Sequence, residues 1–423
     1  MFSKKSILDV PVSDIKGKRI LVRVDFNVPM KDGIIQDDTR IQAACPTLNY
    51  ILSQHPKTLI LMSHLGDPKK DMQKAKEKAL QSGIAFDEEH YLNSKHRMAP
   101  IALHLGQLLK RSIKLAPSAI GEQTQTIVNH LVDGDILMLE NTRFHPEETS
   151  KNPLERERMG KELAGYADLF VNDAFGTAHR AHASTEAVAH YLPAVAGLLM
   201  EKEIQYLGKV MENPDRPFVA IIGGAKVSSK IAVLENLLLK VDRLIVGGGM
   251  AYTFLKAKGL AIGDSLVEDD MLDKAREILQ IAYEKHIYIY LPIDHVVTQE
   301  FSPDAASRHV ARGNIDEGWM GMDIGVLTIE KFIGALKGAK TVFWNGPLGV
   351  FEFERFSKGT MAIAKALSEL PDCTTIIGGG DSVSAVNKSG VADKMTHIST
   401  GGGASLELIE GKVLPGIAAL LDK

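Results

Sequence analysis

Short apolar runs rich in β-branched residues recur along this chain, and each of them ends abruptly in glycine or polar residues. One such run, residues 374–377, is followed at once by Gly378-Gly379-Gly380-Asp381-Ser382 and then by a helix-compatible stretch. This order is typical of a buried strand, a tight turn and the first turn of a helix. Strands that alternate with helices in this way predict an α/β protein with parallel sheets.

Four of these runs lie in the first half of the chain, at residues 19–24, 58–62, 136–139 and 169–171. Ligands of open α/β sheets bind beyond the carboxyl ends of the strands, and arginine forks match pairs of carboxylate or phosphate oxygens. The basic residues at or after these ends are Arg40, His64, Arg143, His179, Arg180 and His182. Taken singly, each is better explained as a surface arginine or a core histidine. Together they favour a basic pocket for a small phosphorylated acid.

The second half repeats the pattern with glycine-rich ends. These ends follow the runs 218–222, 244–246, 341–344 and 374–377, and the segment Ser399-Thr400-Gly401-Gly402-Gly403 closes the set. Glycine lets the backbone approach a ligand closely, and the free amides of a helix N-terminus attract phosphate. Asp381 supplies the carboxylate that a Mg²⁺–phosphate complex requires. One such turn alone is equally an ordinary strand-to-helix connection, but the series predicts a nucleotide cleft on a second sheet.

The length of 423 residues predicts two domains. Residues 185–210 are mostly helix-compatible, and the polar, proline-rich stretch 213–217 follows them. We therefore expect a helix at about 197–211 to link the two halves. Residues 71–99 form a charged, helix-prone segment that we interpret as a solvated surface excursion without assigned chemistry, although Lys69 and Lys70 closely follow the His64 turn.

Composition excludes several classes of protein. The net charge of −4 carries no overall nucleic-acid signature, and Cys45 and Cys373 lack metal-ligand spacing, which fits a reducing compartment. The first residues are polar, and no apolar run approaches the ~20 residues of a membrane span, so a cytoplasmic location is expected. The G-x-x-x-x-G-K-[ST], H-R-D and D-F-G motifs are absent, and no G-x-G-x-x-G fingerprint supports a dinucleotide dehydrogenase.

Over nearly the whole chain, the motifs resemble those of phosphoglycerate kinases and occur in that family's order. They are Arg23-Val24-Asp25-Phe26-Asn27-Val28-Pro29, Ser63-His64-Leu65-Gly66, Glu140-Asn141-Thr142-Arg143-Phe144, Asn172-Asp173-Ala174-Phe175-Gly176-Thr177-Ala178-His179-Arg180, Gly223-Gly224-Ala225-Lys226-Val227, Trp344-Asn345-Gly346-Pro347, Gly378-Gly379-Gly380-Asp381-Ser382 and Thr400-Gly401-Gly402-Gly403-Ala404-Ser405. Any one of these motifs is a weak signal, whereas the ordered set is highly specific.

The resemblance implies two Rossmann-like domains, each a parallel sheet flanked by helices, joined by an interdomain helix and a hinge. Residues 1–196 would bind phosphoglycerate, 197–211 would form the linking helix, 212–408 would bind nucleotide, and 409–423 would return to the first domain as a strap. The implied protein is a monomeric, Mg²⁺-dependent glycolytic enzyme. It would transfer a phosphoryl group reversibly between 1,3-bisphosphoglycerate plus ADP and 3-phosphoglycerate plus ATP.

The resemblance also implies roles for individual residues. The phosphoglycerate site would comprise Asp25, Phe26, Asn27, Arg40, His64, Leu65, Gly66, Asp67, Arg143 and Arg180. The nucleotide site would comprise Gly223, Gly224, Lys226, Lys230, Gly247, Gly248, Asn345, Pro347, Glu352, Gly379, Gly380, Asp381 and Ser382, with Glu352 at the ribose and Asp381 at Mg²⁺. The catalytic residues would be Arg40, Lys226 and Lys230. No general base is expected, because a carboxylate acceptor carries no proton at neutral pH.

Two features depart from the family's pattern. Asp67 stands where the family usually has arginine, so we expect weaker binding of 3-phosphoglycerate. Ser229 replaces a frequent aspartate beside Lys230, a change that we expect to be tolerated. Asp67 alone supports the alternative of a non-catalytic relative, and a dinucleotide dehydrogenase on a similar fold is a third hypothesis that NAD binding would test.

Overall fold

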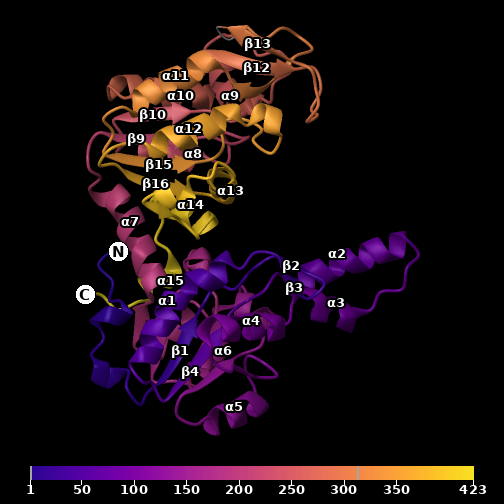
Figure 1. The fold of residues 1–423 in the computed structure, drawn as a ribbon, viewed down its shortest axis with the longest axis vertical. Coiled ribbons are helices and arrows are strands. Elements are labelled where there is room, and N and C mark those ends of the chain that lie inside the picture. Colours follow the sequence, from indigo (N-terminus) through magenta and orange to yellow (C-terminus); the bar gives the residue numbers. More distant parts are fainter. Residues whose placement is uncertain (1, 312–313) are drawn as a thin grey trace. The chain divides into compact units, whose positions relative to one another are not determined.

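The computed structural model describes residues 2–311 and 314–423, which form two compact units (Figure 1). Unit 1 contains the chain up to Gln205 together with Val413–Lys423, and unit 2 contains Tyr206–Lys412. Each unit is built on its own six-stranded parallel sheet. The α/β class with two parallel sheets, predicted from the sequence, is confirmed. Within the described residues, no helix is both long and apolar enough to cross a membrane.

The sheet of unit 1 has the strand order β5-β6-β4-β1-β7-β8. The central strand β1 (Arg19–Arg23) pairs in parallel with β4 (Thr58–Met62) on one side and β7 (Leu169–Asn172) on the other. The outer strands are β6 (Asp135–Met138), β5 (Lys114–Leu115) and β8 (Ala194–Ala196). Since strand order reverses at β1, the carboxyl ends of β1, β4 and β7 form the crevice in which open α/β sheets bind ligands.

Helices of unit 1 pack on this sheet through one apolar face each. Helix α1 (Thr39–Ser53) buries Ile41, Leu48 and Ile51, whose spacing of three to four residues or its multiples places them on one side. The other helices on the body of the unit are α4 (Ala99–Leu109), α5 (Glu122–Asn129) and α6 (Pro153–Ala164). Helix α1 begins directly after its N-cap residue, Asp38, which places Arg40 in the first turn beyond the carboxyl end of β1.

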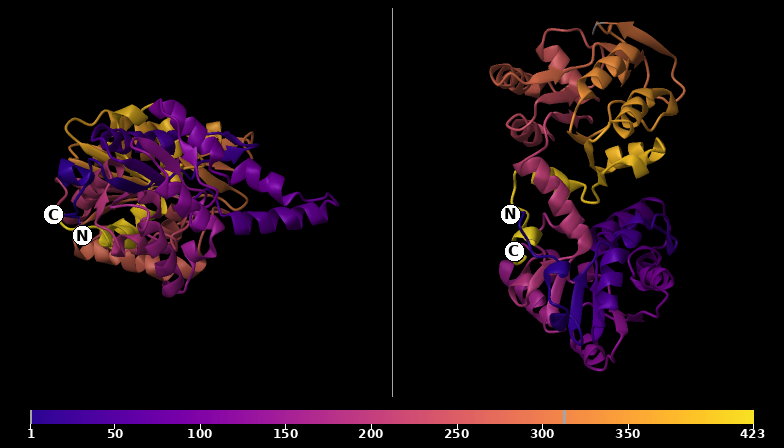
Figure 2. Two further views of the ribbon diagram at one scale, coloured as in Figure 1. Left: turned by 90° about the horizontal axis from the view of Figure 1, so that it is seen from below. Right: turned by 60° about the vertical axis from the view of Figure 1, so that its left-hand side comes forward.

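Helices α2 (Pro68–Gln81) and α3 (Glu88–Lys95) form a hairpin that projects from the body of unit 1 (Figures 1 and 2). Pro68 is the one fully buried residue of α2, and none is fully buried in α3. The solvated excursion that the sequence predicts for residues 71–99 is therefore confirmed for most of its length.

The last residues of the chain fold onto unit 1. The backbone N–H of Gly416, in the short helix α15 (Pro415–Ala418), donates to the carbonyl oxygen of Ala178 at 2.8 Å. The N–H of Leu421 donates to the carbonyl oxygen of Ala194 in the edge strand β8 at 2.9 Å, and Lys4 forms a 2.8 Å ion pair with Asp422. These contacts fix the C-terminal segment beside the start of the chain.

The sheet of unit 2 has the order β11-β10-β9-β15-β16-β17. Its strands are β9 (Phe218–Ile222), β10 (Arg243–Val246), β11 (Tyr288–Tyr290), β15 (Thr341–Asn345), β16 (Thr374–Gly378) and β17 (His397–Ile398). Its helices are α8 (Ile231–Leu237), α9 (Met250–Ala257), α10 (Leu272–Glu284), α11 (Val326–Leu336), α12 (Lys358–Ser368), α13 (Gly380–Lys388) and α14 (Gly403–Ile409). Strand order reverses between β9 and β15, which again defines a binding crevice.

The sequence did not predict a three-stranded antiparallel sheet in unit 2, formed by β12 (Asp294–Thr298), β13 (Ser307–Ala311) and β14 (Met320–Ile324). The mostly exposed and polar character of β13 explains why an apolar-run criterion misses it.

The helix expected at about 197–211 is present as α7, whereas the helix-compatible residues before it do not form one continuous helix. Ala194–Ala196 instead forms β8, which pairs with β7, and helix α7 begins only after it, at Leu198–Glu212. Pro193 lacks the N–H that a continuing helix needs and restricts the residue before it, so a helix that began earlier could not run through it, and residues 194–196 pair with β7 instead.

Candidate active site

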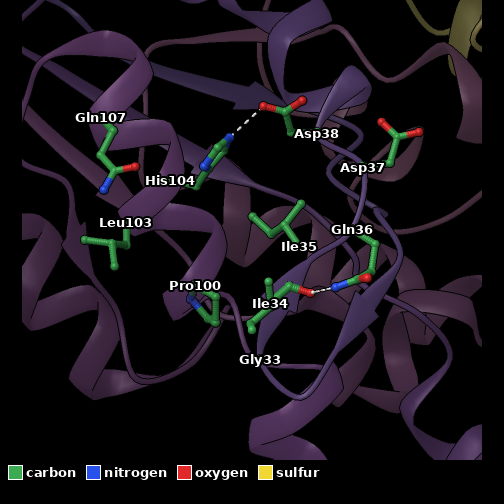
Figure 3. Close-up of a pocket in the computed structure, with 10 residues that line it drawn as sticks. All are labelled: Gly33, Ile34, Ile35, Gln36, Asp37, Asp38, Pro100, Leu103, His104 and Gln107. Carbon is green, nitrogen blue, oxygen red and sulfur yellow. Dashed lines mark hydrogen bonds and ion pairs between the residues drawn. The ribbon is translucent and has the colours of Figure 1, made fainter.

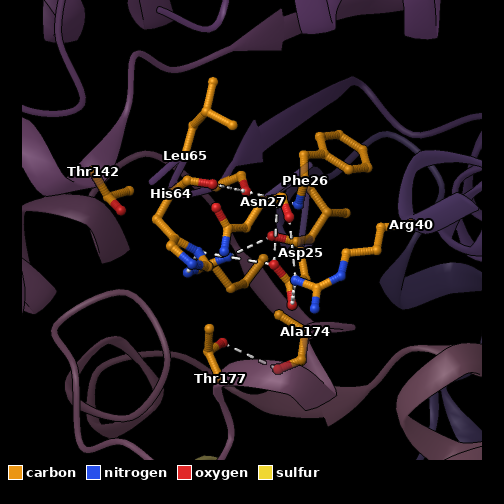
Figure 4. Close-up of polar contacts among 12 residues, drawn as sticks. Asp25, Phe26, Asn27, Arg40, His64, Leu65, Thr142, Ala174 and Thr177 are labelled. Atoms are coloured by element: carbon orange, nitrogen blue, oxygen red, sulfur yellow. Dashed lines mark hydrogen bonds and ion pairs between the residues drawn. The ribbon is translucent and has the colours of Figure 1, made fainter. Parts of the chain in front are cut away.

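Basic side chains lie near one another at the carboxyl edge of the unit 1 sheet, where Figure 4 shows Arg40 and His64 beside Asp25 and Asn27. We call Arg23, Arg40, His64, Arg143, Arg180 and His182 the basic cluster. Burial lowers the pKa of His182 to about 3, and the positive charges of Arg143, Arg23 and Arg180 contribute to that shift. Burial also lowers the pKa of His64 well below its usual range, again with help from Arg23 and Arg143. The two neutral histidines thus lie in a region of concentrated positive charge.

Arg40 is held at the edge of this cluster. Its Nη1 donates to Oδ2 of Asp25 at 3.0 Å and to the carbonyl oxygen of Asn27 at 3.3 Å. The Arg40 side chain nevertheless remains 37% exposed, so the guanidinium has donors left for an anion. The Oδ1 of Asn27 accepts from the N–H of Gly66 at 2.8 Å, which connects the loops after β1 and β4.

Arg23 belongs to the cluster and lies in one of the family motifs, but it was not among the predicted site residues. It is fully buried in β1, and its Nη2 lies 3.1 Å from Nδ1 of His64. Because a guanidinium only donates, Nδ1 accepts and the proton of His64 is on Nε2. Arg23 Nε donates to Ser184 Oγ at 2.8 Å, and Ser184 Oγ donates to the buried Glu148 at 2.6 Å. The sequence signal for its role was a charged residue, Arg23, within the apolar part of the run 19–24.

The loop after β4 is fixed from several sides. Arg143 Nη1 donates to the carbonyl oxygen of Gly66 at 2.7 Å, and the side-chain amide of Asn141 bonds both the N–H and the carbonyl of Leu65. Nε of Arg143 is buried and has no hydrogen-bond partner within the described part of the chain. Phe26 and Leu65 are almost completely buried, and their backbone N–H and carbonyl groups already bond to other residues, so they shape the site from beneath.

Two predicted substrate residues differ in placement from the rest. Asp67 is the N-cap of α2, where its Oδ1 accepts from the N–H of Lys70 at 3.3 Å. The aspartate therefore satisfies a free amide of the helix start, which an arginine could not do. Arg180 is exposed, and its positive charge contributes to the lowered pKa of His182.

A cavity of about 700 Å³ in unit 1 lies between the β2–β3 hairpin (Met30–Lys31 and Ile34–Ile35) and α4 (Figure 3). None of the predicted site residues lines it. However, Nε2 of His104 lies 2.7 Å from Oδ2 of Asp38, the N-cap residue of the helix that carries Arg40.

Unit 2 contains a cavity of about 440 Å³ at the carboxyl edge of its sheet. It is lined by Gly223, Gly224, Ala225, Lys226, Ser229, Lys230, Asn345, Gly346, Pro347, Gly379, Gly380, Asp381, Ser382, Gly402, Gly403 and Leu406. These residues come from the loops after β9 and β15 and from the first turns of α13 and α14. Most of the predicted nucleotide residues are thus brought together, whereas Gly247, Gly248 and Glu352 are not among the lining residues.

Close backbone contacts explain several glycines of this cavity. The N–H of Gly224 donates to the carbonyl oxygen of Pro347 at 3.0 Å, and a Cβ on Gly223 would lie 2.1 Å from the same oxygen. Gly247 and Gly248 support the loop after β15 from outside the cavity. The N–H of Gly248 donates to the carbonyl oxygen of Leu348 at 3.1 Å, and a Cβ on Gly247 would lie 2.4 Å from the Leu348 side chain. Close packing therefore explains why both positions are glycine.

Polar groups inside the cavity are connected. Lys230 Nζ donates to Oδ1 of Asn345, whose Nδ2 donates to the carbonyl oxygen of Gly378 at 2.8 Å. Burial lowers the pKa of Lys230, and the negative charge of Asp381 opposes that shift. Asp381 lies in the first turn of α13, and Ser382 Oγ accepts from the N–H of Gly346. The cavity thus combines cations, free helix-start amides and one carboxylate, a set suited to a phosphate-bearing ligand with a divalent cation.

Comparisons with known proteins agree with this picture. The family model described as Phosphoglycerate kinase matches residues 9–412. Phosphoglycerate kinases of two Treponema pallidum strains, one of them strain Nichols, are each 52% identical over 409 residues, covering 96% of this chain and 97% of the relative. The solved phosphoglycerate kinase structures from Coxiella burnetii (38% identical, TM-score 0.83) and Pyrococcus horikoshii OT3 (31% identical, TM-score 0.79) each match over 98% of both chains.

Sequence similarity and fold similarity therefore extend over nearly the whole chain, and both sites lie inside the matched region. The dinucleotide dehydrogenase hypothesis has no support in these comparisons. The chain belongs to the phosphoglycerate kinase family.

Proposed function

We propose that the basic cluster binds 3-phosphoglycerate, that the unit 2 cavity binds the nucleotide, and that a phosphoryl group passes directly between the two. As a phosphoglycerate kinase, the chain is a glycolytic phosphotransferase whose acceptor is a carboxyl group. The observation that carries the proposal is the convergence of arginines and neutral histidines at one sheet edge, facing few carboxylates.

The donors of the basic cluster match the two anionic ends of 3-phosphoglycerate. Arg40 and Arg180 are accessible, the Nε of Arg143 is unpaired within the described residues, and His64 presents its Nε2 proton. Asp25 and Asn27 position Arg40 and the Gly66 loop, while Phe26, Leu65 and Gly66 would shape the site through backbone that neighbouring residues hold in place. Asp67 supplies no cation, so we expect the affinity for 3-phosphoglycerate to be lower than with arginine at that position.

The unit 2 cavity offers the groups that nucleotide phosphates need. The amides of Gly379, Gly380 and Ser382 at the start of α13 and the side chains of Lys226 and Lys230 would surround the phosphates. Gly223, Gly224, Asn345 and Pro347 form the floor that admits the nucleotide, and Gly247 and Gly248 hold that floor in place. Glu352, which is exposed, would bond the ribose.

The donor set of this cavity fits Mg²⁺ bound together with a nucleotide. Asp381 is the only carboxylate among the described lining residues, and the described chain has no group of three or more side chains that could hold a metal by themselves. Mg²⁺ usually takes one or two carboxylates and completes its shell with phosphate oxygens and water. Asp381 would therefore hold the ion, which neutralises phosphate charge when it is bound.

Transfer needs positioning and stabilisation of charge rather than covalent help from the protein. Arg40, Lys226 and Lys230 would stabilise the charge on the transferring group, and no general base is required because the acceptor carboxylate is already ionised. The two ligands must meet, so we propose hinge closure about the linking helix, which would also exclude water as a competing acceptor. We also propose that the enzyme acts as a cytoplasmic monomer, with residues 1–196 and 212–408 as its substrate domains and 409–423 as a strap.

A coupled assay for 3-phosphoglycerate-dependent consumption of ATP with Mg²⁺ tests the proposal. We expect robust turnover in the wild type and a loss of kcat of about 10²–10³ in Lys230→Ala. Lys365→Ala, which removes an exposed lysine of α12 in the same unit, is the control and should retain activity. A folded wild type that binds nucleotide but shows no turnover would favour the non-catalytic relative instead.

A further inference from the structure

The base of the α2–α3 hairpin contacts the loop that follows His64. The Oδ2 of Asp71, in α2, accepts from the N–H of Asp67 at 3.1 Å. The Nδ1 of His96, the C-cap residue of α3, lies 3.2 Å from the carbonyl oxygen of Leu65. Because a carbonyl oxygen only accepts, Nδ1 is the protonated nitrogen. A segment that the sequence leaves without chemistry thus bonds the backbone on both sides of Gly66.

The His96 ring also fills the space next to Gly66. The residue is only 2% exposed, and a Cβ on Gly66 would lie 2.7 Å from its Cε1 and 2.8 Å from its Nδ1. Gly66 has a φ of +64°, the left-handed region that glycine adopts without strain. The turn at Gly66 and the imidazole therefore fit each other, and movement of either one requires movement of the other.

The opposite side of the same turn faces the proposed substrate site. Gly66 N–H donates to Asn27 at 2.8 Å, and its carbonyl oxygen accepts from Arg143 at 2.7 Å. Gly66 is thus shared between two residues of the proposed 3-phosphoglycerate site and two residues of the hairpin base. A displacement of this turn would move both substrate residues.

We propose that His96 and Asp71 form a loop clamp that holds residues 65–67 in the conformation that binds 3-phosphoglycerate. His96 is the principal positioning residue of this clamp, and the outer part of the hairpin is not needed for it. The inference rests on the proposed function, because it assigns the Gly66 loop to substrate binding. It also predicts that the clamp acts on 3-phosphoglycerate and not on ATP.

The test compares His96→Leu, which removes the hydrogen bond, with His96→Asn, whose amide can donate from nearly the same place as Nδ1. We expect His96→Leu to raise the KM for 3-phosphoglycerate roughly five- to tenfold, the equivalent of about one lost hydrogen bond. The KM for ATP should stay unchanged, and His96→Asn should recover most of the loss. A merely structural histidine would lower the melting temperature without this selective change in KM.

Two controls separate the clamp from general effects. Leu80→Ser changes an 83% exposed side chain near the outer end of α2 and should leave both KM values unchanged. His295→Leu removes a fully buried histidine of unit 2 and should lower the melting temperature without raising the KM for 3-phosphoglycerate. If His96→Leu does not fold, Asp71→Ala removes the other contact of the clamp and should raise the same KM.

An unchanged KM for 3-phosphoglycerate in folded His96→Leu, or in Asp71→Ala, would overturn the clamp while wild-type turnover leaves the proposed function standing. Absence of wild-type turnover would instead overturn the proposed function, and the clamp with it. Direct calorimetric binding of 3-phosphoglycerate to each variant distinguishes weakened binding from slowed chemistry.

Discussion

The Nη2 of Arg23 lies 3.1 Å from the Nδ1 of His64, and both side chains are buried at the carboxyl edge of the first sheet. Arg23 also bonds Ser184, which in turn bonds Glu148, so the arginine connects a histidine of the proposed substrate site to a buried carboxylate. Burial raises the pKa of Glu148, and the charge of Arg23 opposes that shift. The pair thus determines both the tautomer of His64 and the charge balance beneath the site.

Arg23→Met should reduce the free energy of unfolding by about 3–5 kcal/mol, because it leaves Glu148 buried without its cationic neighbour. The double variant Arg23→Met/Glu148→Gln should recover part of that stability. It should not recover the KM for 3-phosphoglycerate, because His64 still lacks the donor that orients it. Denaturant unfolding and steady-state kinetics check both parts, and a normal KM in the double variant would contradict the proposed role of Arg23.

Asp67 provides a second prediction, because it stabilises the start of α2 but supplies no positive charge for the substrate. Asp67→Arg should lower the KM for 3-phosphoglycerate by adding a cation, while loss of the N-cap reduces stability by about 0.5–2 kcal/mol. Asp67→Ala is the matched control: it loses the cap and the negative charge but adds no cation, so its KM should fall less than that of Asp67→Arg. An unchanged KM in Asp67→Arg would show that this position does not limit substrate affinity.

His104 bonds Asp38 (Figure 3), the N-cap residue of helix α1, which carries Arg40 in its first turn. His104→Ala leaves Asp38 with Gln42 as its remaining side-chain partner, bonded at 2.8 Å, and should loosen the first turn of α1. We expect a loss of about 1 kcal/mol of stability and a raised KM for 3-phosphoglycerate. Leu103→Ala, a 69% exposed residue that lines the same cavity, should change neither quantity. Equal kinetic effects of both variants would argue against this support.

Asp323 predicts a pH dependence of stability. Burial raises the pKa of its carboxyl to about 7, although the N–H groups of Gly359 and Ile324 donate to it. Because this pKa exceeds that of the unfolded chain, 3.8, the folded state binds the proton more tightly, and its stabilising effect is lost as pH rises from about 4 through 7.

Asp323→Asn should therefore flatten the decline of unfolding free energy across that window, which amounts to roughly 2–4 kcal/mol. Asp173 in unit 1 provides a comparison, because burial raises its pKa to about 6. Asp173→Asn should remove the part of the pH dependence of the unfolding free energy that this carboxyl contributes below about pH 6. The pH dependence between 6 and 7 should remain. Chemical denaturation from pH 4.5 to 8 measures both slopes, and identical profiles in wild type and Asp323→Asn would rule out this assignment.

The strands whose residues are buried on both faces of the sheet were the elements best predicted from the sequence. The runs 58–62 and 218–222 coincide with β4 and β9, because an uninterrupted apolar stretch bounded by polar or glycine residues leaves little choice of boundary. The strands β5, β8 and β11 are only two or three residues long and depend on pairing with a neighbour. No local pattern could reveal them.

The same distinction applies to the candidate site. Glycine-rich strand ends identified most of the unit 2 cavity, since each end lies at the edge of one parallel sheet. The support of the basic cluster was not predictable in this way, because Ser184 and Glu148 are far from Arg23 along the chain, with 161 positions separating Ser184 from it. His96 was equally hidden, since it ends a charged helical segment whose other residues are not fully buried.

Gly379 offers the sharpest test of the nucleotide cavity. Its φ is +88°, and a Cβ would lie 2.6 Å from Nδ2 of Asn345, the residue that accepts from Lys230. Gly379→Ala should therefore strain the turn before α13, displace Asn345 and reduce kcat while raising the KM for ATP. The KM for 3-phosphoglycerate should change little. Gly334→Ala is the matched control, because a Cβ there meets nothing within 4 Å inside helix α11 and should stabilise the helix by about 1 kcal/mol. Normal ATP kinetics in Gly379→Ala would show that Asn345 need not hold Lys230 for transfer to occur.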